Sequence, residues 1–454
     1  MEHWSRKAVF YHIYPLGLCG APERNDFSSL PEPRLNQLYG WLDHLQELGV
    51  NALYLGPLFE SSRHGYDTAD YYSVDRRLGD KQTLTRLVAE LHRRGMHVIL
   101  DGVFNHVGRD FWAFRDVLQN GQNSAFCDWF EDINFSQRSP YNDPFSYAAW
   151  SGNYDLVKLN LSNPAVRAHL LQAVAMWLTD FLIDGLRLDV ADCLDLGFQQ
   201  ELAAHCKALR LDFWLLGEVI HGDYRRWVNP QTLDSVTNYE CYKGLYSSHV
   251  DHNLFEIAYS LQRQFGAEGI YRDLPLYAFA DNHDVDRVAS KLSSPAQLYS
   301  LYCLLFCMPG VPSIYYGSEW GLTGLRSPSS DTALRPALNL QEAVMNAPQP
   351  ELPAAIARLA QVRRTSLALQ YGSYQQLQVS SEQMAFARQC PEQTVVVLIN
   401  IGDQSARVEV PLPDPSGSQL VDLLNLGEVF EIQAGQSALN IDIPAHWGRI
   451  LQIQ

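Results

Sequence analysis

The sequence predicts an α/β fold in which a (β/α)8 barrel of the TIM type carries an irregular domain after its third strand and an antiparallel β-sandwich at its C-terminal end. Three observations support this prediction. Eight short apolar segments alternate with amphipathic segments over about 320 residues, one long aromatic-rich stretch interrupts the alternation, and strand-like segments separated by turn residues close the sequence. A doubly wound open sheet is the alternative for the alternating part.

The alternating part supplies the strands and helices of the barrel. Near-continuous apolar strands between helices indicate parallel strands that are buried on both faces. The expected strands are residues 9–14, 52–56, 97–101, 185–190, 213–218, 235–239, 276–280 and 313–316. The expected helices are residues 34–48, 81–94, 164–181, 196–209, 254–265 and 295–307, the third of which begins at Pro164 after the capping pair Ser162-Asn163.

A long insertion follows Asn105-His106 and shows turn residues without a sustained helical period. Residues 111–154 hold 12 aromatic side chains in 44 positions, whereas about five are expected at the chain's aromatic content of 11%. Loops of this length inside a compact domain are usually functional. The rings can serve as a small core for the insertion itself, or they can stack on the apolar faces of sugars.

From about residue 371 the pattern is that of a small antiparallel β-sandwich. The expected strands there are residues 393–400, 406–410, 419–424 and 446–453. The sequence therefore predicts three parts: the barrel in residues 1–106 and 155–370, the inserted domain in residues 107–154, and the β-sandwich in residues 371–454.

Charge and apolar pattern argue against two classes of partner. The 454-residue chain has a net charge of −17 and would repel a phosphate backbone, so no nucleic-acid partner is expected. No apolar run reaches the ~20 residues that cross a bilayer. Residues 8–15 are interpreted as the first strand rather than as a signal peptide, because polar residues and Pro15 interrupt them. With eight scattered cysteines expected to be free thiols, we expect a cytoplasmic chain that starts at Met1.

Acidic side chains close several expected strands, at the edge where a barrel carries its active site. Asp189 ends the fourth strand two residues after Arg187, and period-2 alternation places both side chains on one face. A neighbouring cation lowers the pKa of a carboxyl group, so Asp189 is expected to be ionised, as a nucleophile must be. Glu218 ends the apolar fifth strand, where desolvation is expected to raise its pKa and keep a proton available.

Two further strand ends carry Asp284 beside His283, and His106 after Asn105. Two carboxyl groups with opposed pKa tendencies in one cleft are what cleavage of a glycosidic bond requires. The competing interpretations are helix caps or barrel salt bridges, and a metal site built from histidines and aspartates. The sequence contains no H-x-H or H-E-x-x-H spacing, which counts against the metal site.

These strand ends lie in ordered motifs that resemble those of a known family. DGVFNH at 101–106, GLRLDVAD at 185–192, LLGEV at 215–219 and FADNHD at 279–284 resemble the four signature regions of the α-amylase family, glycoside hydrolase family 13. The stretches at 49–62, 64–75 and 310–319 resemble its accessory motifs. The resemblance covers residues 1 to about 330 in the family's order, and the C-terminal sandwich agrees with the family's domain C.

The resemblance implies roles for the residues that match the signature regions. Asp189 would be the nucleophile that forms a β-glycosyl enzyme, and Arg187 would orient it. Glu218 would protonate the leaving oxygen and then activate water, and Asp284 would hold the 2- and 3-hydroxyls of the distorted sugar. A retaining mechanism of this kind places the carboxyl groups of Asp189 and Glu218 about 5–5.5 Å apart.

Three further residues are implied to contact the same sugar, His106 and His283 through its hydroxyls and Tyr66 by stacking beneath it. No cofactor is implied and no metal ligand is assigned. Asn105 matches a calcium ligand of amylases, but the rest of that calcium site is not recognisable, so calcium binding stays open.

Some positions depart from the family pattern. Residues 190–193 (VADC) lack the Lys-His pair of typical extracellular α-amylases, which leaves their acceptor-side contacts open. Residues 157–160 (VKLN) resemble a motif of neopullulanases and cyclomaltodextrinases, although we expect no N-terminal domain of the kind that those enzymes use in dimerisation, since the first barrel strand is expected at residues 9–14. Ser318 stands where an acid is common before Glu319.

We therefore expect a retaining α-glucoside hydrolase that cleaves α-1,4 linkages of maltooligosaccharides or cyclodextrins by double displacement. Its partner is a small oligosaccharide, with neither nucleic acid nor membrane, and its oligomeric state is open. One alternative is a 4-α-glucanotransferase or glucoside isomerase on the same scaffold, in which a sugar hydroxyl replaces water. A non-catalytic sugar-binding member is a more distant alternative, disfavoured because Asp189, Glu218 and Asp284 are all present.

Overall fold

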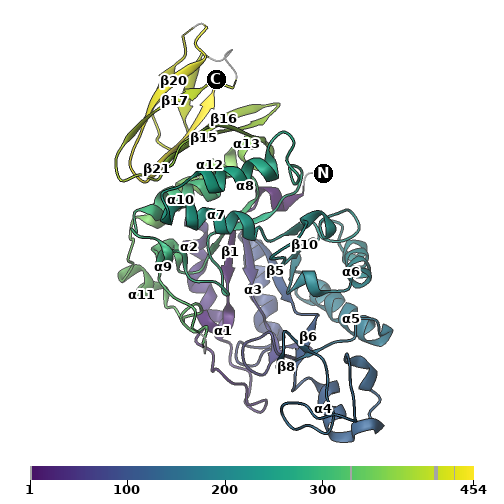
Figure 1. Cartoon of the computed structure of the whole chain (residues 1–454). Coiled ribbons are helices and arrows are strands. Elements are labelled where there is room, and N and C mark those ends of the chain that lie inside the picture. Colours follow the sequence, from purple (N-terminus) through teal and green to yellow (C-terminus); the bar gives the residue numbers. More distant parts are fainter. Residues whose placement is uncertain (1–2, 328–329, 414–417, 434) are drawn as a thin grey trace.

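A parallel barrel, an inserted segment and a C-terminal antiparallel β domain make up the chain. The computed structural model describes residues 3–327, 330–413, 418–433 and 435–454. The barrel lies in the middle of the molecule, with the β domain at one end and the insertion at the other (Figure 1). The predicted fold class is confirmed, whereas the predicted domain boundaries stay predictions.

Eight parallel strands form the barrel in the order β11-β10-β9-β5-β2-β1-β13-β12. The two outer strands meet at a parallel bridge between Thr237 and Tyr277, and the Asn238 amide donates to the Tyr277 carbonyl oxygen at 2.8 Å, which closes the barrel. Each strand overlaps its predicted range. The bounds are β1 Phe10–Ile13, β2 Ala52–Leu55, β5 His97–Gly102, β9 Gly185–Leu188, β10 Trp214–Gly217, β11 Ser235–Val236, β12 Tyr277–Phe279 and β13 Val311–Tyr315.

Alternate side chains fill the barrel interior in layers of different polarity. Phe10 and Trp214 belong to an aromatic layer, with ring centroids 5.2 Å apart. Gly185 of β9 lies beside Trp214, where a Cβ would come within 2.4 Å of the Trp214 carbonyl oxygen. Two residues further along their strands, His12 and Arg187 are buried in a polar layer. This polar layer therefore rests on a close-packed aromatic floor.

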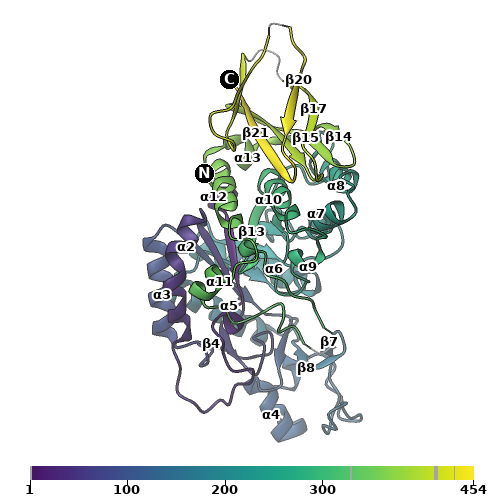
Figure 2. The same cartoon turned by 90° about the vertical axis from the view of Figure 1, so that its left-hand side faces the viewer.

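Helices cover the outside of the barrel, and Figure 2 shows α2 and α3 along one flank. The helix expected at 34–48 is divided into the 3₁₀ helix η2 (Arg34–Trp41) and α2 (Leu42–Glu47). Pro33 provides no side-chain cap and Gly40 lies within the segment, and both weaken regular α-helix formation. The Asn163 side chain caps α5 as predicted.

The remaining helices include α7 and α12, which the sequence pattern did not predict. Their bounds, with those of the other helices, are α1 Pro15–Leu18, α3 Lys81–Arg93, α5 Pro164–Asp180, α6 Leu196–Leu209, α7 Tyr239–Val250, α8 Phe255–Phe265, α9 Val288–Lys291, α10 Gln297–Cys307, α11 Leu340–Met345, α12 Leu352–Thr365 and α13 Leu367–Tyr371. Before the insertion, a hairpin of β3 (Phe59–Ser61) and β4 (Thr68–Val74) extends from the end of β2.

The insertion is more regular than predicted. It contains the helix α4 (Trp112–Asn120) and a sheet of β6 (His106–Gly108), β8 (Asn153–Lys158) and β7 (Ala149–Trp150). The prediction of no sustained helix is therefore wrong, because aromatic rings give α4 a buried face. Phe114 stands edge-to-face with Tyr147 at 5.0 Å, so many of the insertion's rings do form its own core.

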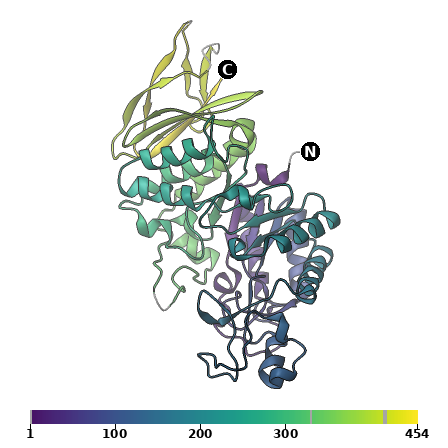
Figure 3. The same ribbon diagram turned by 45° about the vertical axis from the view of Figure 1, so that its right-hand side comes forward.

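The C-terminal domain packs two antiparallel sheets over a shared apolar core. The larger has the order β14-β15-β16-β21-β18-β19, and the smaller pairs β17 with β20. Figure 3 shows the domain at the end of the molecule opposite the insertion. The four expected strands are present as β16, β17, β18 and β21. The bounds are β14 Ser373–Val379, β15 Gln383–Cys390, β16 Gln393–Asn400, β17 Ala406–Pro411, β18 Gln419–Asp422, β19 Val429–Glu431, β20 Ala438–Ile443 and β21 Trp447–Ile453.

The cysteines agree with the expectation of free thiols. All eight cysteines are free thiols, and Cys193 is the exposed one among them. In the described ranges, no helix combines the length and the apolar character that crossing a bilayer requires.

Two buried arginines cap the end of α10, one from α12 and one from the C-terminal domain. The last carbonyl groups of a helix have no partner within the helix. Arg363 of α12 donates to the Phe306 carbonyl oxygen at 3.2 Å, and Arg388 of β15 donates to the Cys307 carbonyl oxygen at 2.8 Å. Burial lowers the pKa of Arg363 to about 10 and that of Arg388 to about 9. Main-chain dipoles therefore stabilise these two desolvated charges.

Replacing Arg388 with Met is expected to lower the free energy of unfolding by about 2–3 kcal/mol, because it leaves buried carbonyl groups without a donor. Urea denaturation of the full chain measures this change. The matched control Arg407→Met, on the exposed side of β17, is expected to change stability by less than about 0.5 kcal/mol. An Arg388→Met variant as stable as the control would contradict the capping role.

Candidate active site

The three predicted catalytic acids lie at one rim of the barrel. Asp189 follows β9 directly, Glu218 follows β10 directly, and Asp284 lies in the loop after β12. Parallel strands end at the same rim, so the loops that follow them face one cleft. The structure connects all three acids through one network of hydrogen bonds and ion pairs.

The Arg187 guanidinium is the centre of this network. Its Nη1 lies 2.9 Å from Asp189 Oδ1 and 2.9 Å from Asp101 Oδ1, and its Nη2 lies 2.7 Å from Glu218 Oε2. Arg187 is 3% exposed, so these charge-assisted bonds form away from solvent, where they are strong. The structure thus brings Asp189 and Glu218 onto neighbouring nitrogens of one side chain.

Glu218 is held by a second donor from the strand next to it. The Val190 amide donates to Glu218 Oε2 at 3.0 Å, and the Ala191 amide donates to the Glu218 carbonyl oxygen at 2.9 Å. Val190 reaches this position with a φ of 39°, a left-handed conformation that is unusual for a β-branched residue. Such backbone outliers concentrate at functional sites. Arg187 and the Val190 amide both act on Oε2, whereas Oε1 accepts a longer bond of 3.5 Å from the Tyr239 hydroxyl and is the less engaged oxygen.

Asp284, His283 and Tyr66 form a second wall of the cleft. His283 Nε2 lies 2.9 Å from Asp284 Oδ2, and the Tyr66 hydroxyl contacts His283 Nε2 and donates to Asp101 Oδ2 at 2.9 Å. The Tyr66 and His283 rings are stacked, with centroids 5.4 Å apart. Asp101, which the sequence analysis did not assign to the site, therefore joins Tyr66 to Arg187.

Arg335 and Asp331 are site residues that sequence reasoning missed. Arg335 Nη2 lies 2.8 Å from Asp284 Oδ1 and 3.3 Å from Asp331 Oδ2, and its guanidinium stands 4.8 Å from the centroid of the Tyr14 ring. Both residues lie in the irregular segment after β13, where neither strand periodicity nor a signature motif marks them. The D-x-x-x-R spacing is too common to have identified them.

Three buried imidazoles near the acids each carry a nitrogen without a hydrogen-bond partner among the described residues. His106 Nε2, 3.8 Å from Asp189 Oδ2, has no hydrogen-bond partner among the described residues, and the same holds for His283 Nδ1 and His12 Nε2. Burial lowers the pKa of His106 to about 3 and holds that of His12 well below its usual range, so both rings are neutral near pH 7. Buried polar atoms of this kind are normally satisfied, and sugar hydroxyls can donate to or accept from them.

Burial dominates the ionisation of the central carboxyl pair. It raises the pKa of Asp189 well above its usual range, and it also raises the pKa of Glu218. Arg187 lowers both, as the sequence analysis expected for Asp189, but the burial effect and the nearby carboxylates outweigh it. The expected net direction is therefore wrong for Asp189 and confirmed for Glu218. A proton is retained by the pair more readily than by either acid in water.

Asp284 titrates in the opposite direction. Burial opposes its ionisation, but the charges and hydrogen bonds of His283 and Arg335 outweigh burial and hold the pKa of Asp284 far below its usual range. The site therefore combines a permanently ionised carboxylate with a pair that can carry one proton.

Ser318 hydrogen-bonds to Asp281, the acid that follows β12 in the motif FADNHD at 279–284. Its hydroxyl donates to Asp281 Oδ2 at 2.9 Å and accepts from Arg287 Nη1 at 3.1 Å. Burial raises the pKa of Asp281, against the charge of Arg287. A serine at this position gives Asp281 a donor without adding a second negative charge.

The residues around Asn105 do not suit calcium. Across the described part of the chain, no three acidic, histidine or cysteine side chains converge as a metal site. Lys158 lines the same cavity of about 420 Å³ as Asn105 and pairs with Glu131 at 2.8 Å. Calcium prefers several oxygen ligands and an excess of negative charge, which an ammonium group opposes.

Comparison with known proteins gives the family. The model described as "Alpha amylase, catalytic domain" matches residues 35–349, more than half of the chain. The chain belongs to the alpha-amylase family. Within this family it is a glycoside hydrolase similar to cyclomaltodextrinases and neopullulanases, and the model of a neopullulanase-like C-terminal domain matches residues 374–444.

Individual alpha-amylase family members match along nearly the whole chain. Cyclomaltodextrinase of Geobacillus thermopakistaniensis is 30% identical, over 98% of this chain and 76% of its own length. Neopullulanase 2 of Thermoactinomyces vulgaris is 32% identical, over 99% of this chain and 78% of its own. The crystal structure of a debranching enzyme from Nostoc punctiforme has a TM-score of 0.84 at 30% identity and covers 99% of this chain and 100% of that one. The family resemblance seen in the sequence is confirmed.

Asp189→Asn is expected to stabilise the fold, and the gain should grow with pH. The folded-state pKa of Asp189 lies above its unfolded value near 3.9, so the wild type loses stability as pH rises from about 4 through the raised pKa. The amide cannot ionise and avoids this loss. We expect a gain of about 1–2 kcal/mol at pH 7 and a smaller one at pH 4, measured by urea denaturation.

The exposed Asp192, three residues away, provides the matched control. Asp192→Asn is expected to show no pH-dependent gain. An Asp189→Asn variant less stable than the wild type at pH 7, or with the same gain at both pH values, would contradict the electrostatic account.

Proposed function

We propose that this alpha-amylase family hydrolase cleaves α-1,4 linkages of maltooligosaccharides or cyclodextrins with retention, through a covalent β-glycosyl intermediate. The observation that carries the proposal is the pair of contacts from Arg187 to Asp189 and Glu218, because a close carboxyl pair is what double displacement requires. Relatives named cyclomaltodextrinase and neopullulanase support this substrate class.

In the first step the two carboxyl groups act through different oxygens. Arg187 holds Oδ1 of Asp189, so Oδ2 is free to attack the anomeric carbon. Two donors hold Oε2 of Glu218, so its proton resides on Oε1 and passes to the glycosidic oxygen as the bond breaks. The productive form therefore carries the pair's single proton on Glu218 and leaves Asp189 ionised.

The sugar that reacts is held from the opposite wall. Asp284, kept ionised by its contacts with His283 and Arg335, accepts from its hydroxyls, and the neutral His106 pairs with another hydroxyl through its unpartnered Nε2, as His283 does through its Nδ1. Tyr66, fixed by its contacts with Asp101 and His283, supports the ring. In the second step Glu218, now deprotonated, accepts a proton from water that releases the sugar from Asp189.

A second candidate is hydrolysis of glucans with α-1,6 branches. The Nostoc enzyme called a debranching enzyme matches this chain over the full length of both proteins, which the two curated relatives above do not.

We further propose a cytoplasmic location, since an enzyme named intracellular maltogenic amylase from Bacillus subtilis is 28% identical.

Incubation of the full chain with maltotriose, β-cyclodextrin, pullulan and isomaltose, followed by ¹H NMR, tests the proposal. We expect cleavage of maltotriose and β-cyclodextrin, with the α-anomer of the new reducing end appearing before the β-anomer. Glu218→Gln is the inactive control, expected to lose at least about 10³-fold in kcat. A β-anomer appearing first contradicts retention, attack on α-1,6 links alone favours the second candidate, and accumulation of longer glucans indicates a transferase.

A further inference from the structure

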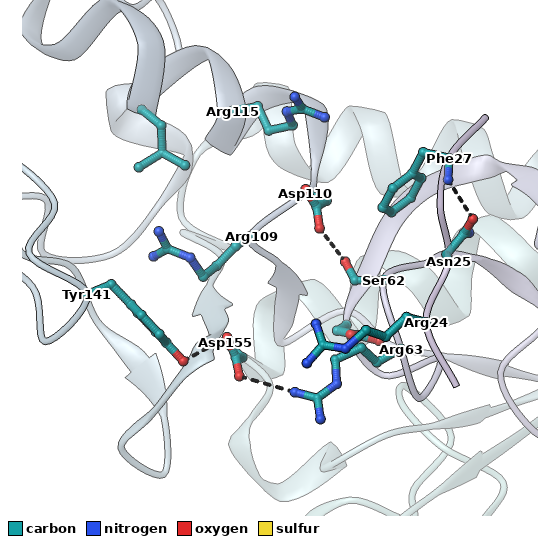
Figure 4. Close-up of a pocket in the computed structure, with 12 residues that line it drawn as sticks. Arg24, Asn25, Phe27, Ser62, Arg63, Arg109, Asp110, Arg115, Tyr141 and Asp155 are labelled. Atoms are coloured by element: carbon teal, nitrogen blue, oxygen red, sulfur yellow. Dashed lines mark hydrogen bonds and ion pairs between the residues drawn. The ribbon is translucent and has the colours of Figure 1, made fainter. Parts of the chain in front are cut away.

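A second pocket of about 540 Å³ lies between the loop after β1, the β3–β4 hairpin and the insertion. Figure 4 shows the Tyr141 ring on one side of it and the Phe27 ring on the other, with arginine and aspartate side chains between them. None of these residues belongs to the catalytic network described above. Opposed aromatic rings with polar groups between them are the pattern of a site for a sugar.

Tyr141 is exposed and yet fixed in place. Half of it is exposed, its hydroxyl donates to Asp155 Oδ1 at 2.8 Å, and the Arg109 guanidinium covers its ring at 4.5 Å from the centroid. Arg109 is itself held by Asp143 at 2.8 Å. Arg109 therefore packs on one face of the Tyr141 ring, and Asp155 fixes its hydroxyl. Because the side chain is already ordered, the apolar face of a sugar can stack on its exposed surface with little loss of side-chain entropy.

The charges in the pocket nearly cancel. It is lined by Arg24, Arg63, Arg109 and Arg115 and by Asp67, Asp110 and Asp155, and Asp143 already compensates Arg109. This balance favours a neutral ligand rich in hydroxyl groups over a phosphate or another anion. Guanidinium donors and carboxylate acceptors together match such a ligand, since each hydroxyl can both donate and accept.

The pocket adjoins a larger cavity whose lining includes Arg335, the ion-pair partner of Asp284. Arg63 lines both, and its guanidinium lies 3.9 Å from Asp155 on one side and 3.7 Å from Glu23 on the other. The larger cavity, of about 790 Å³, is also lined by Arg335, which binds Asp284. A glucan chain can therefore follow one surface from Asp284 past Arg63 to Tyr141.

The position of Glu218 sets the direction of that chain. Glu218 protonates the oxygen on the leaving side of the reacting sugar, whereas Asp284 and Arg335 lie on the other wall of the cleft. The part of the substrate that runs toward Arg335 and Arg63 is thus the part that remains attached to the enzyme after the first step.

We propose that the pocket between Tyr141 and Phe27 is a distal subsite for the non-reducing part of long linear α-glucans. This inference rests on the proposed function for the identity of the ligand. The ring of Tyr141 stacks on a glucose unit, and the enzyme consequently discriminates in favour of chains long enough to reach it.

Isothermal titration calorimetry with maltotriose to maltooctaose, on full-length Glu218→Gln so that no substrate is consumed, tests this subsite. Adding Tyr141→Ala is expected to weaken binding of the longest chains about three- to tenfold, as loss of one stacking contact predicts, and that of maltotriose less than twofold. Tyr141→Phe keeps the ring and is expected to retain most of the affinity. Tyr259→Ala, an exposed tyrosine on α8, is the matched control and should change neither.

The inference is overturned if Tyr141→Ala weakens all chain lengths equally, if it weakens none, or if Glu218→Gln binds no maltooctaose. These results can be told apart from a failure of the proposed function. A wild type that hydrolyses no glucan defeats the proposed function, whereas the length dependence of binding still decides the role of Tyr141.

Discussion

One buried cation, Arg187, organises the catalytic end of this barrel. Its guanidinium contacts Asp101, Asp189 and Glu218, which come from the ends of three adjacent strands. A charge in this position is tolerated only because it is fully paired, and the three carboxylates are tolerated for the same reason. Loss of Arg187 would leave three desolvated carboxyl groups without a cation, so the spacing of these strand ends is tightly constrained.

Three features of the fold position Arg187 and its partners: the aromatic layer under them, the close approach of β9 to β10, and the turn after β9. The Phe10–Trp214 stack forms the floor under the polar layer, and Gly185 lets β9 approach β10 closely enough for Arg187 to reach Glu218. The left-handed turn at Val190 then aims a main-chain donor at the same carboxylate. Burial that raises the pKa of Asp189 and Glu218 is unfavourable for stability and useful for proton transfer, a common trade between the two.

The sequence was sufficient to predict the features that depend on local pattern. Strand periodicity placed Arg187 and Asp189 on one face, and strand ends predicted that Glu218 and Asp284 share a cleft with them. Features that depend on tertiary contacts could not be predicted from the sequence. Arg335 reaches Asp284 from an irregular segment, and α4 is stabilised by rings distant in sequence. The sequence also could not predict the direction in which the pKa of Asp189 shifts. The neighbouring Arg187 is visible in the strand, but the burial that outweighs it depends on the whole barrel.

We propose that Arg187 presents Asp189, rather than Glu218, as the attacking carboxylate. Trapping of the glycosyl enzyme with a 5-fluoro-α-maltosyl fluoride, followed by proteolysis and mass spectrometry, tests it most directly. We expect a single label on the peptide that contains Asp189, with the ester on that side chain. A label on Glu218 or Asp284, or inactivation without any covalent label, would contradict it.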